Sequence, residues 1–420
     1  MDKFIAQGGV PLKGTVTVNG SKNAALPILI ASLLTDGECV ARRVPPLRDI
    51  RAAQRLLEAL GKKTVYENNS VRILPGRRLS TAAPYDLVRR MRASVLVAGP
   101  LLARFHEARV PLPGGCAIGL RPVDIHLKGF EKLGAKIITG QGDLLISAGK
   151  LRGAKIKFPF PSVGATENIM LCAALAPGVT VIENAALEPE IDDLAACLNG
   201  MGASVRRAPD GKIIIEGRTG LNGFSHDVMA DRIEAGTYLI AVAAAGGRAE
   251  IRGCEPKHIR AVLSALEKSG ARLKINDGTI AITGPKNRPA PVSIKTLPYP
   301  GFPTDLQALW MAYMCRARGA SIIKETIFEN RFMHAAELGR MGARISVRGS
   351  AAVVDGVDAL SGASVMASDL RGGAALTVAA VCAAGKSVIR RVYHIDRGYR
   401  RLEEGLRALG AKIRRASEEM

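Results

Sequence analysis

The chain has 420 residues, a formal net charge of +21, 47% hydrophobic residues and only 4% aromatic residues. It contains no apolar run of the ~18–20 residues that a membrane span needs, and Met1-Asp2-Lys3-Phe4 lacks the basic and apolar regions of a signal peptide. We therefore do not expect a membrane-spanning or secreted protein. We expect a cytoplasmic protein of two domains with a core of Ala, Val, Ile and Leu.

The charge and the cysteines narrow the class further. Basic residues are spread along the whole chain and few aromatic side chains are available to stack on bases, so we expect a solvated basic surface and an anion-binding cleft rather than a nucleic-acid-binding protein. Seven cysteines show neither metal-ligand spacing nor a disulfide framework, which predicts reduced thiols. Six of them lie in apolar or strand-like segments and are expected in the core: Cys39, Cys172, Cys197, Cys254, Cys315 and Cys382.

A phrase of the type Leu-Gly-Ala-Lys-Ile recurs six times, with its glycines 68 to 73 residues apart. A helical pattern precedes each glycine. A short alternating segment with a turn follows most of them, as in Arg272 to Thr283 around Asn276-Asp277-Gly278. Each glycine is therefore expected to end a helix and lead into a hairpin, and six α+β units of about 70 residues would fill the chain. The glycines are Gly61, Gly134, Gly202, Gly270, Gly342 and Gly410.

In chain order, the first candidate site is Ser21-Lys22-Asn23, which precedes the apolar run 24–30. Serine or asparagine could simply cap this helix, with Lys22 as a solvated charge. Alternatively, Lys22 at a helix N-terminus binds an anion, because the N–H groups and the helix dipole there also favour negative charge. The turn 162–166 (Ser-Val-Gly-Ala-Thr) begins a second apolar helix, and its small residues leave N–H groups accessible to a diphosphate.

Between these two helix starts lies Pro111 to Asp124, with Cys116 directly after two glycines and Arg121 five residues later. Glycine permits backbone conformations that other residues rarely adopt, so we expect a loop. The segment is either a turn with an incidental buried cysteine or a loop whose thiol gives or takes a proton beside an anionic substrate. The segment alone does not separate these two interpretations.

The C-terminal half repeatedly places charge at the start of an apolar helix. Asp305 follows Pro303-Thr304 and is either a first-turn acid or a general base. Segments 328–334, 369–373 and 393–399 each bring an arginine to the edge of a repeat. Several such arginines converging would bind a substrate that carries phosphate and carboxylate groups.

Taken together, these motifs resemble those of the UDP-N-acetylglucosamine enolpyruvyl transferases, over essentially the whole chain. The cysteine loop and the first and last motifs are together highly specific. The motifs are 20–27 (GSKNAALP), 91–94 (MRAS), 113–116 (PGGC), 121–124 (RPVD), 162–166 (SVGAT), 188–191 (EPEI), 231–234 (DRIE), 303–305 (PTD), 329–334 (ENRFMH), 369–371 (DLR) and 394–399 (HIDRGY).

The resemblance implies an α/β fold. It is a two-domain inside-out α/β barrel of six repeats, with helices inside and sheets outside. One domain would take 21–229 with the Cys116 loop and the uridine pocket. The other would take 1–20 with 230–420 and carry Asp305, Asp369, Arg371 and Arg397. The active site of this family lies in a cleft between the domains, and the cleft closes on substrate.

The resemblance also implies a reaction. The enolpyruvyl group of phosphoenolpyruvate moves to the 3-hydroxyl of UDP-N-acetylglucosamine with release of phosphate, the first committed step of peptidoglycan synthesis. No metal and no cofactor is expected. Cys116 would donate the proton, hold a covalent adduct and react with the inhibitor fosfomycin, and Asp305 would take the hydroxyl proton.

The remaining implied roles concern substrate binding. Lys22, Arg121 and Arg397 would clamp phosphoenolpyruvate, and Asn23 would hold the reacting groups. Arg121 to Ile125 would shape the uridine pocket. The other binding residues implied are Arg92, Pro122, Val123, Asp124, Ser162, Val163, Gly164, Ile327, Arg331, Asp369 and Arg371.

The chain departs from the family pattern in two places. Phe160-Pro161 stands where many relatives have a lysine, which removes a possible diphosphate cation, and Gly372-Gly373 could loosen a helix start. Two rivals remain: a 5-enolpyruvylshikimate-3-phosphate synthase, or a non-catalytic or RNA-binding relative on the same fold. The Cys116 loop with Arg121 to Asp124 argues against the first, and the intact Lys22, Cys116, Asp305 and Arg397 argue against the second.

Overall fold

A computed structural model describes residues 2–76, 78–89, 91–112 and 123–417. Contacts divide these residues into two compact units. The terminal unit comprises 2–19 and 230–417, and the middle unit comprises 20–112 and 123–229. Within the described ranges, no helix combines the length and the apolar character that crossing a bilayer would require.

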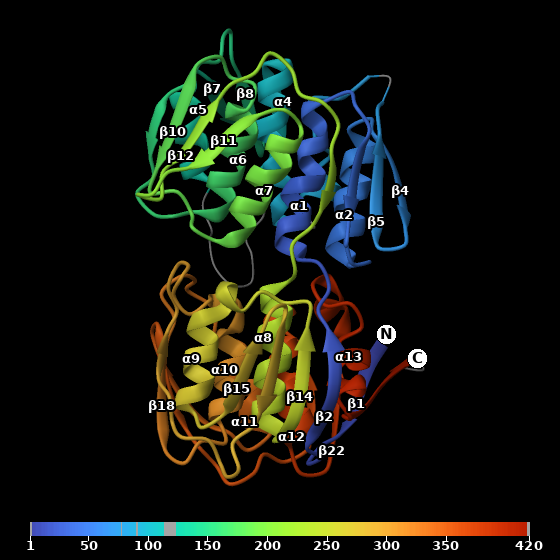
Figure 1. The fold of residues 1–420 in the computed structure, drawn as a ribbon, viewed down its shortest axis with the longest axis vertical. Coiled ribbons are helices and arrows are strands. Elements are labelled where there is room, and N and C mark those ends of the chain that lie inside the picture. The colour runs from blue at the N-terminus through green and yellow to red at the C-terminus, as the bar shows by residue number, and fades with distance from the viewer. Residues whose placement is uncertain (1, 77, 90, 113–122, 418–420) are drawn as a thin grey trace. The chain divides into compact units, whose positions relative to one another are not determined.

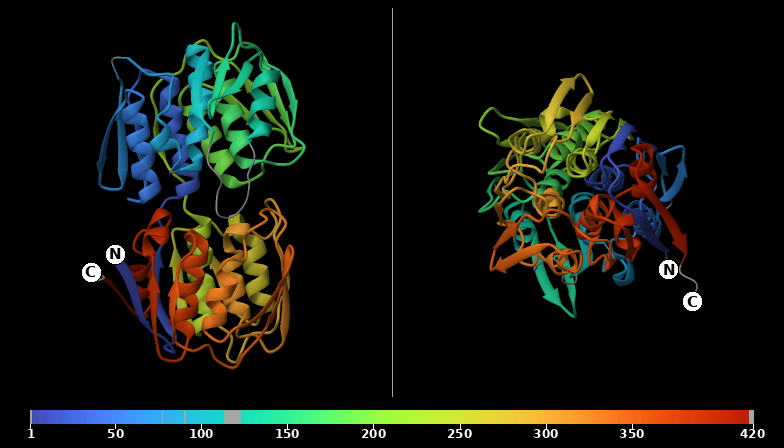
Figure 2. Two further views of the ribbon diagram at one scale, coloured as in Figure 1. Left: turned by 180° about the vertical axis from the view of Figure 1, so that it is seen from behind. Right: turned by 90° about the horizontal axis from the view of Figure 1, so that it is seen from below.

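Within each unit, helices lie on the inside and three small sheets lie around them (Figures 1 and 2). Five of the six sheets have the same strand arrangement, in which a short edge strand runs parallel to its neighbour and the next two pairs are antiparallel. The sixth sheet has three strands, and a single parallel bridge between Ala82 and Arg109 stands in place of the edge strand.

In the middle unit the sheets are, in spatial order, β13 (Ser225–Asp227), β3 (Cys39–Arg42), β5 (Ser70–Leu74) and β4 (Lys63–Glu67); β9 (Lys155–Lys157), β10 (Val179–Glu183), β12 (Ile213–Glu216) and β11 (Ser204–Arg207); and β6 (Glu107–Pro111), β8 (Asp143–Ser147) and β7 (Lys136–Gly140). In the terminal unit they are β2 (Leu12–Thr17), β14 (Gly247–Arg252), β16 (Thr279–Thr283) and β15 (Arg272–Asn276); β17 (Ile294–Lys295), β18 (Ala320–Lys324), β20 (Ala351–Asp355) and β19 (Arg344–Arg348); and β21 (Ser364–Met366), β22 (Lys386–Arg390), β1 (Asp2–Gln7) and β23 (Lys412–Ser417).

Six helices are apolar on nearly all sides and form the interior of the units. Small side chains dominate them, which lets α8, α10 and α12 pack against one another and α4 pack against α6. They are α1 (Lys22–Ala31), α4 (Ala98–Phe105), α6 (Val163–Ala173), α8 (Arg232–Ala245), α10 (Gln307–Met314) and α12 (Leu370–Cys382).

Six further helices each precede one of the repeated glycines. They are α2 (Arg48–Ala59), α5 (Asp124–Lys132), α7 (Pro189–Gly200), α9 (Arg260–Lys268), α11 (His334–Arg340) and α13 (Leu402–Ala408). The six glycines have φ between 86° and 105°, the left-handed conformation that ends a helix most easily at glycine. Five of the glycines lead into a hairpin. The predicted repeat, including the turn at Asn276 to Gly278, is therefore confirmed.

The short remaining elements are α3 (Tyr85–Val88), η1 (Ser32–Leu34), η2 (Arg92–Val97), η3 (Pro256–Ile259), η4 (Thr304–Leu306) and η5 (Val392–Arg397). After the sixth glycine, Gly410, no hairpin follows. Instead, β23 pairs with the N-terminal strand β1 over six positions, and β1 also pairs with β22. The N-terminal strand thus completes the last repeat, and the two ends of the chain lie in one sheet (Figure 1).

Six cysteines lie in the described part of the chain, and all six are buried free thiols, as expected from their apolar surroundings. Burial raises the pKa of each, to about 11 for Cys254 and to about 12 for Cys315 and Cys382. The seventh, Cys116, lies outside the described residues, as do Arg121 and Pro122.

Candidate active site

The predicted site residues fall into two groups, one in each unit. In the terminal unit, Asp305 is at the centre of a cluster of charges. Its Oδ1 accepts a hydrogen bond from Arg331 at 2.8 Å, and its Oδ2 accepts one from Arg371 at 3.0 Å. The arginine side chains are only 5% and 4% exposed, whereas Asp305 is 27% exposed. The carboxylate is therefore held from behind by two buried guanidinium groups and remains partly open to solvent.

Local structure explains how Asp305 reaches this position. It lies in the short helix η4, which follows Pro303 and runs into the apolar helix α10. The buried Glu325, at the end of β18, accepts hydrogen bonds from Thr296 at 2.8 Å and from Thr304 at 2.9 Å. Glu325 therefore ties the residue before Asp305 to the adjacent strands.

Glu325 also organises the segment that carries Ile327. Its Oε1 accepts the backbone N–H of Ile327 at 2.7 Å and that of Phe328 at 3.2 Å. The N–H of Ile327 is thus already used within the chain, which leaves its carbonyl oxygen as the backbone group that could contact a ligand.

Asp369 and Arg371 lie at the first turn of α12. The Asp369 carboxylate caps this helix by accepting the N–H groups of Arg371 and Gly372, each at 3.0 Å. A Cβ at Gly372 would lie 2.7 Å from the carboxylate of Asp369, and one at Gly373 would lie 2.7 Å from Ile395. The two glycines therefore allow close packing at this turn, and the capped helix begins at Leu370 despite them.

His334 is buried beside Asp369 and Arg331. Burial, together with the charge of Arg331, lowers the pKa of His334 to about 4, although Asp369 acts in the opposite direction. Burial alone would raise the pKa of Asp369, but the N–H of Gly372 and the charges of Arg331 and His334 outweigh it and lower that pKa. At neutral pH the pair is therefore a neutral imidazole and a carboxylate.

Arg397 is half-buried at the end of η5 and directly precedes Gly398. Two residues later in the chain, the Tyr399 hydroxyl lies 2.8 Å from Thr237 Oγ1, and the Arg371 guanidinium carbon lies 5.2 Å from the centre of the Tyr399 ring. The segment that carries Arg397 is thus joined through Tyr399 and Arg371 to Asp305.

In the middle unit, Lys22 is the first residue of α1, and Ser21 caps that helix by accepting the N–H of Ala24 at 3.4 Å. The Lys22 ammonium lies 3.4 Å from the carboxylate of Asp49 in the first turn of α2, and both side chains are largely buried. Cap and cation are therefore both present, and Asp49 orients the lysine.

The other predicted residues of this unit lie at three helix starts. Asn23 is the second residue of α1, and Arg92 begins η2; both are half-buried. Val123 precedes α5, where Asp124 is exposed and Ile125 is half-buried. Ser162 caps α6 by accepting the N–H of Ala165 at 3.3 Å, and the half-buried Val163 and Gly164 form its first turn. The preceding Phe160 is 42% exposed.

The sequence analysis missed several residues that support these groups. Asn168 in α6 lies 3.1 Å from His126 Nδ1 and accepts the N–H of Gly99 at 2.8 Å, which joins α5, α6 and α4. Asn168 interrupts an apolar run, and this was the signal available. Glu325 and Asp49 give no such signal, because their partners come from other parts of the chain.

The comparisons with known proteins can be placed against this geometry. The model of the family described as EPSP synthase (3-phosphoshikimate 1-carboxyvinyltransferase) matches residues 6–406. The chain belongs to the EPSP synthase family. A relative from Elusimicrobium minutum, named UDP-N-acetylglucosamine 1-carboxyvinyltransferase, is 56% identical over 414 residues, which are 98% of each chain. A relative of the same name from Trichlorobacter lovleyi is 52% identical over 419 residues, which are 100% of each chain.

Among solved structures, the enolpyruvyl transferase NikO from Streptomyces tendae superposes with a TM-score of 0.88 at 23% identity, covering 100% of this chain and 99% of that chain. This likeness shows the fold alone. The resemblance drawn from the motifs and the expected α/β fold class are confirmed, and members of the EPSP synthase family with this degree of identity are named as transferases.

Proposed function

We propose that this protein transfers the enolpyruvyl group of phosphoenolpyruvate to the 3-hydroxyl of UDP-N-acetylglucosamine. In the addition step, C-2 of phosphoenolpyruvate bonds to the sugar oxygen, C-3 gains a proton and the hydroxyl loses one. In the elimination step, C-3 loses a proton, the C-2–phosphate bond breaks and phosphate leaves. The names of the two full-length relatives support this choice of acceptor.

The observation that carries the proposal is the placement of Asp305. Its carboxylate is partly exposed, and the two nearly buried arginines at 2.8 and 3.0 Å fix both of its oxygens. A carboxylate fixed in this way can accept the hydroxyl proton without first reorienting, which general-base catalysis requires. We assign this role to Asp305.

The other roles follow the resemblance, residue by residue. Cys116 is proposed to protonate C-3 and to be the residue that fosfomycin alkylates. Lys22, Arg121 and Arg397 are proposed to bind phosphoenolpyruvate, with Arg92 and Arg371 in support, because cations at such positions stabilise phosphate and carboxylate groups. The Lys22–Asp49 pair at 3.4 Å supports the lysine's part, since Asp49 fixes the direction of the ammonium.

The sugar nucleotide is proposed to bind mainly to the middle unit. The start of α6, with Ser162, Val163 and Gly164, offers backbone N–H groups and a positive helix end to the diphosphate. Arg121 to Ile125 are proposed for the uridine. The two domains proposed from the resemblance, 21–229 and 1–20 with 230–420, would then each contribute part of the chemistry.

A phosphate-release assay tests the proposal. The protein is incubated with phosphoenolpyruvate and either UDP-N-acetylglucosamine or shikimate 3-phosphate. We expect release with the sugar nucleotide only. Release with shikimate 3-phosphate only would favour the activity that gives the family model its name, and release with neither would indicate a non-catalytic relative.

A further inference from the structure

The C-terminal strand β23 carries an arginine whose surroundings no proposed role explains. Strand β23 alternates, with Ile413 and Arg415 on its inner face and Lys412 and Arg414 exposed on its outer face. An arginine on the inner face of a sheet is unusual because burying a charge is costly unless it is paired. Only 19% of the Arg415 side chain is exposed.

All five N–H groups of the Arg415 guanidinium donate to carboxylates, and these belong to three different residues. Its NH1 and NH2 groups form a two-pronged pair with Asp396 at 3.0 and 2.6 Å. Its Nε and NH2 bind Glu403 at 2.8 and 3.3 Å, and NH1 also reaches Asp2 at 3.1 Å. The guanidinium lies over the ring of the buried Phe4, 5.1 Å from its centre.

This network holds the segment that carries Arg397. Asp396 directly precedes Arg397 in η5, and Glu403 lies in the first turn of α13. The segment between them has a left-handed residue at each end, Arg391 with φ of 57° and Arg401 with φ of 48°. Neither is glycine, so the backbone is strained by about 1–2 kcal/mol at each point and needs surrounding contacts to keep its shape.

Anchoring β23 itself does not require the network. The strand already pairs with β1 over six positions, and Ile413 is buried beneath it. What the network adds is a fixed distance between the terminal sheet and η5. We infer that Arg415 is a positioning residue, which holds the η5 turn through Asp396 and thereby sets the direction of the Arg397 side chain.

This inference rests on the proposed function, in which Arg397 binds phosphoenolpyruvate. Its test uses the full-length protein with Arg415→Met, which keeps the length of the side chain and removes every donor. Arg414→Met is the matched control, since it removes an exposed arginine from the other face of the same strand. For each variant, kcat and KM are measured for both substrates, and circular dichroism and thermal melting report the fold.

We expect Arg415→Met to lower kcat/KM for phosphoenolpyruvate by about 10- to 100-fold, because misplacing a binding group by about 1 Å can cost that much. The KM for UDP-N-acetylglucosamine and all values for Arg414→Met should stay near those of the wild type. A purely structural role would lower the active fraction without changing either KM. Arg415→Met with both KM values unchanged would therefore overturn the inference.

If Arg415→Met does not fold, Asp396→Asn decides, because it keeps the shape of that side chain and leaves the Arg415–Glu403 pair intact. A higher KM for phosphoenolpyruvate alone would support the inference, and unchanged KM values would contradict it. Loss of the fold in both variants would show a structural anchor and overturn it too. Wild-type protein without transfer to UDP-N-acetylglucosamine would instead count against the proposed function.

Discussion

At the scale of single residues, the candidate site consists of groups whose positions are fixed by neighbours distant in the sequence. Asp305 is held by Arg331 and Arg371, and Lys22 is held by Asp49. In each case a proposed catalytic or binding group has a partner that restricts its orientation. Such restriction is what separates a reactive side chain from a solvated surface charge.

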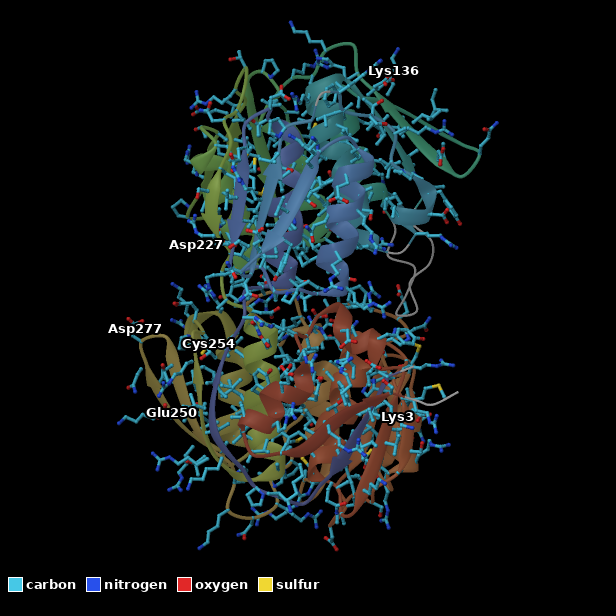
Figure 3. All side chains as sticks on the ribbon, turned by 90° about the vertical axis from the view of Figure 1, so that its right-hand side faces the viewer. Lys3, Lys136, Asp227, Glu250, Cys254 and Asp277 are labelled. Atoms are coloured by element: carbon cyan, nitrogen blue, oxygen red, sulfur yellow. The ribbon has the colours of Figure 1, made fainter. Side chains whose placement is uncertain are left out.

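The first prediction concerns Asp305. Asp305→Asn should lower kcat by at least about 100-fold, because the amide keeps the shape of the side chain but cannot accept the proton. It should also lower thermal stability, since the two buried arginines lose the charge that compensates theirs. Asp277→Asn is the control, as Asp277 is exposed at the tip of the β15–β16 hairpin (Figure 3). Steady-state kinetics decide, and near-normal kcat in a folded Asp305→Asn protein would remove the assignment.

The second prediction concerns Cys116. Burial raises the thiol pKa of each of the other six cysteines, so none of them supplies much thiolate at neutral pH. Fosfomycin should therefore alkylate Cys116 selectively, and the sugar nucleotide should speed the reaction. Cys116→Asp should abolish labelling while keeping an acid and some activity. Peptide mapping by mass spectrometry reads the label; label on Cys39 or Cys254 with Cys116 untouched would refute the role.

At the scale of elements, the predictable features were those that depend on a local pattern. The six glycines end helices because left-handed backbone is easy only for glycine, and Ser21 and Ser162 cap α1 and α6 because their oxygens accept nearby N–H groups. Glu325, Asp49 and Arg415 could not be found in this way. Each acts on a partner from another repeat or from the opposite end of the chain, and no periodicity marks such a contact.

The third prediction concerns the junction of α11 and α12, where His334 is buried. His334 has a pKa of about 4 in the folded protein against 6.5 in the unfolded chain. As the pH falls from 6.5 to 4, the unfolded chain takes up the proton first, so the free energy of unfolding decreases in this window, by at most about 3 kcal/mol. Above pH 6.5 the effect is absent.

His334→Gln should remove most of this loss of stability between pH 6.5 and 4. His106→Gln, at an exposed helix end, should leave it unchanged. Urea unfolding at pH 7 and pH 4.5 measures the difference. Asp369, whose pKa is lowered, contributes a loss of the same sign but at a lower pH, so it does not account for a change in this range. Equal pH dependence in wild type and His334→Gln would contradict the assignment.

At the scale of the whole molecule, the charge of +21 is spread over the outer faces of the sheets rather than gathered in one groove. The clearest example is the sheet β21–β22–β1–β23. Its outward positions carry Lys3, Lys386, Arg390, Lys412 and Arg414, and none of the described positions on this face is acidic. Figure 3 shows Lys3 on this sheet. Apart from Tyr393 and His394 in η5, such faces offer few rings for base stacking.

The fourth prediction follows from this distribution. A face with five cations that binds a single-stranded RNA through phosphate contacts alone should lose about 100-fold in affinity between 50 and 200 mM salt, because each neutralised phosphate contributes about −0.7 to the logarithmic salt slope. Binding to random RNA should therefore be weak and independent of sequence, and it should vanish at moderate salt. Replacing Lys412 and Arg414 with Gln should reduce the slope by about 1.4 without changing enzyme turnover. Fluorescence anisotropy against salt concentration measures both. Sequence-selective binding that persists in high salt would mean that the basic surface is a true nucleic-acid site, because only contacts to the bases survive when the phosphate contribution has been screened away.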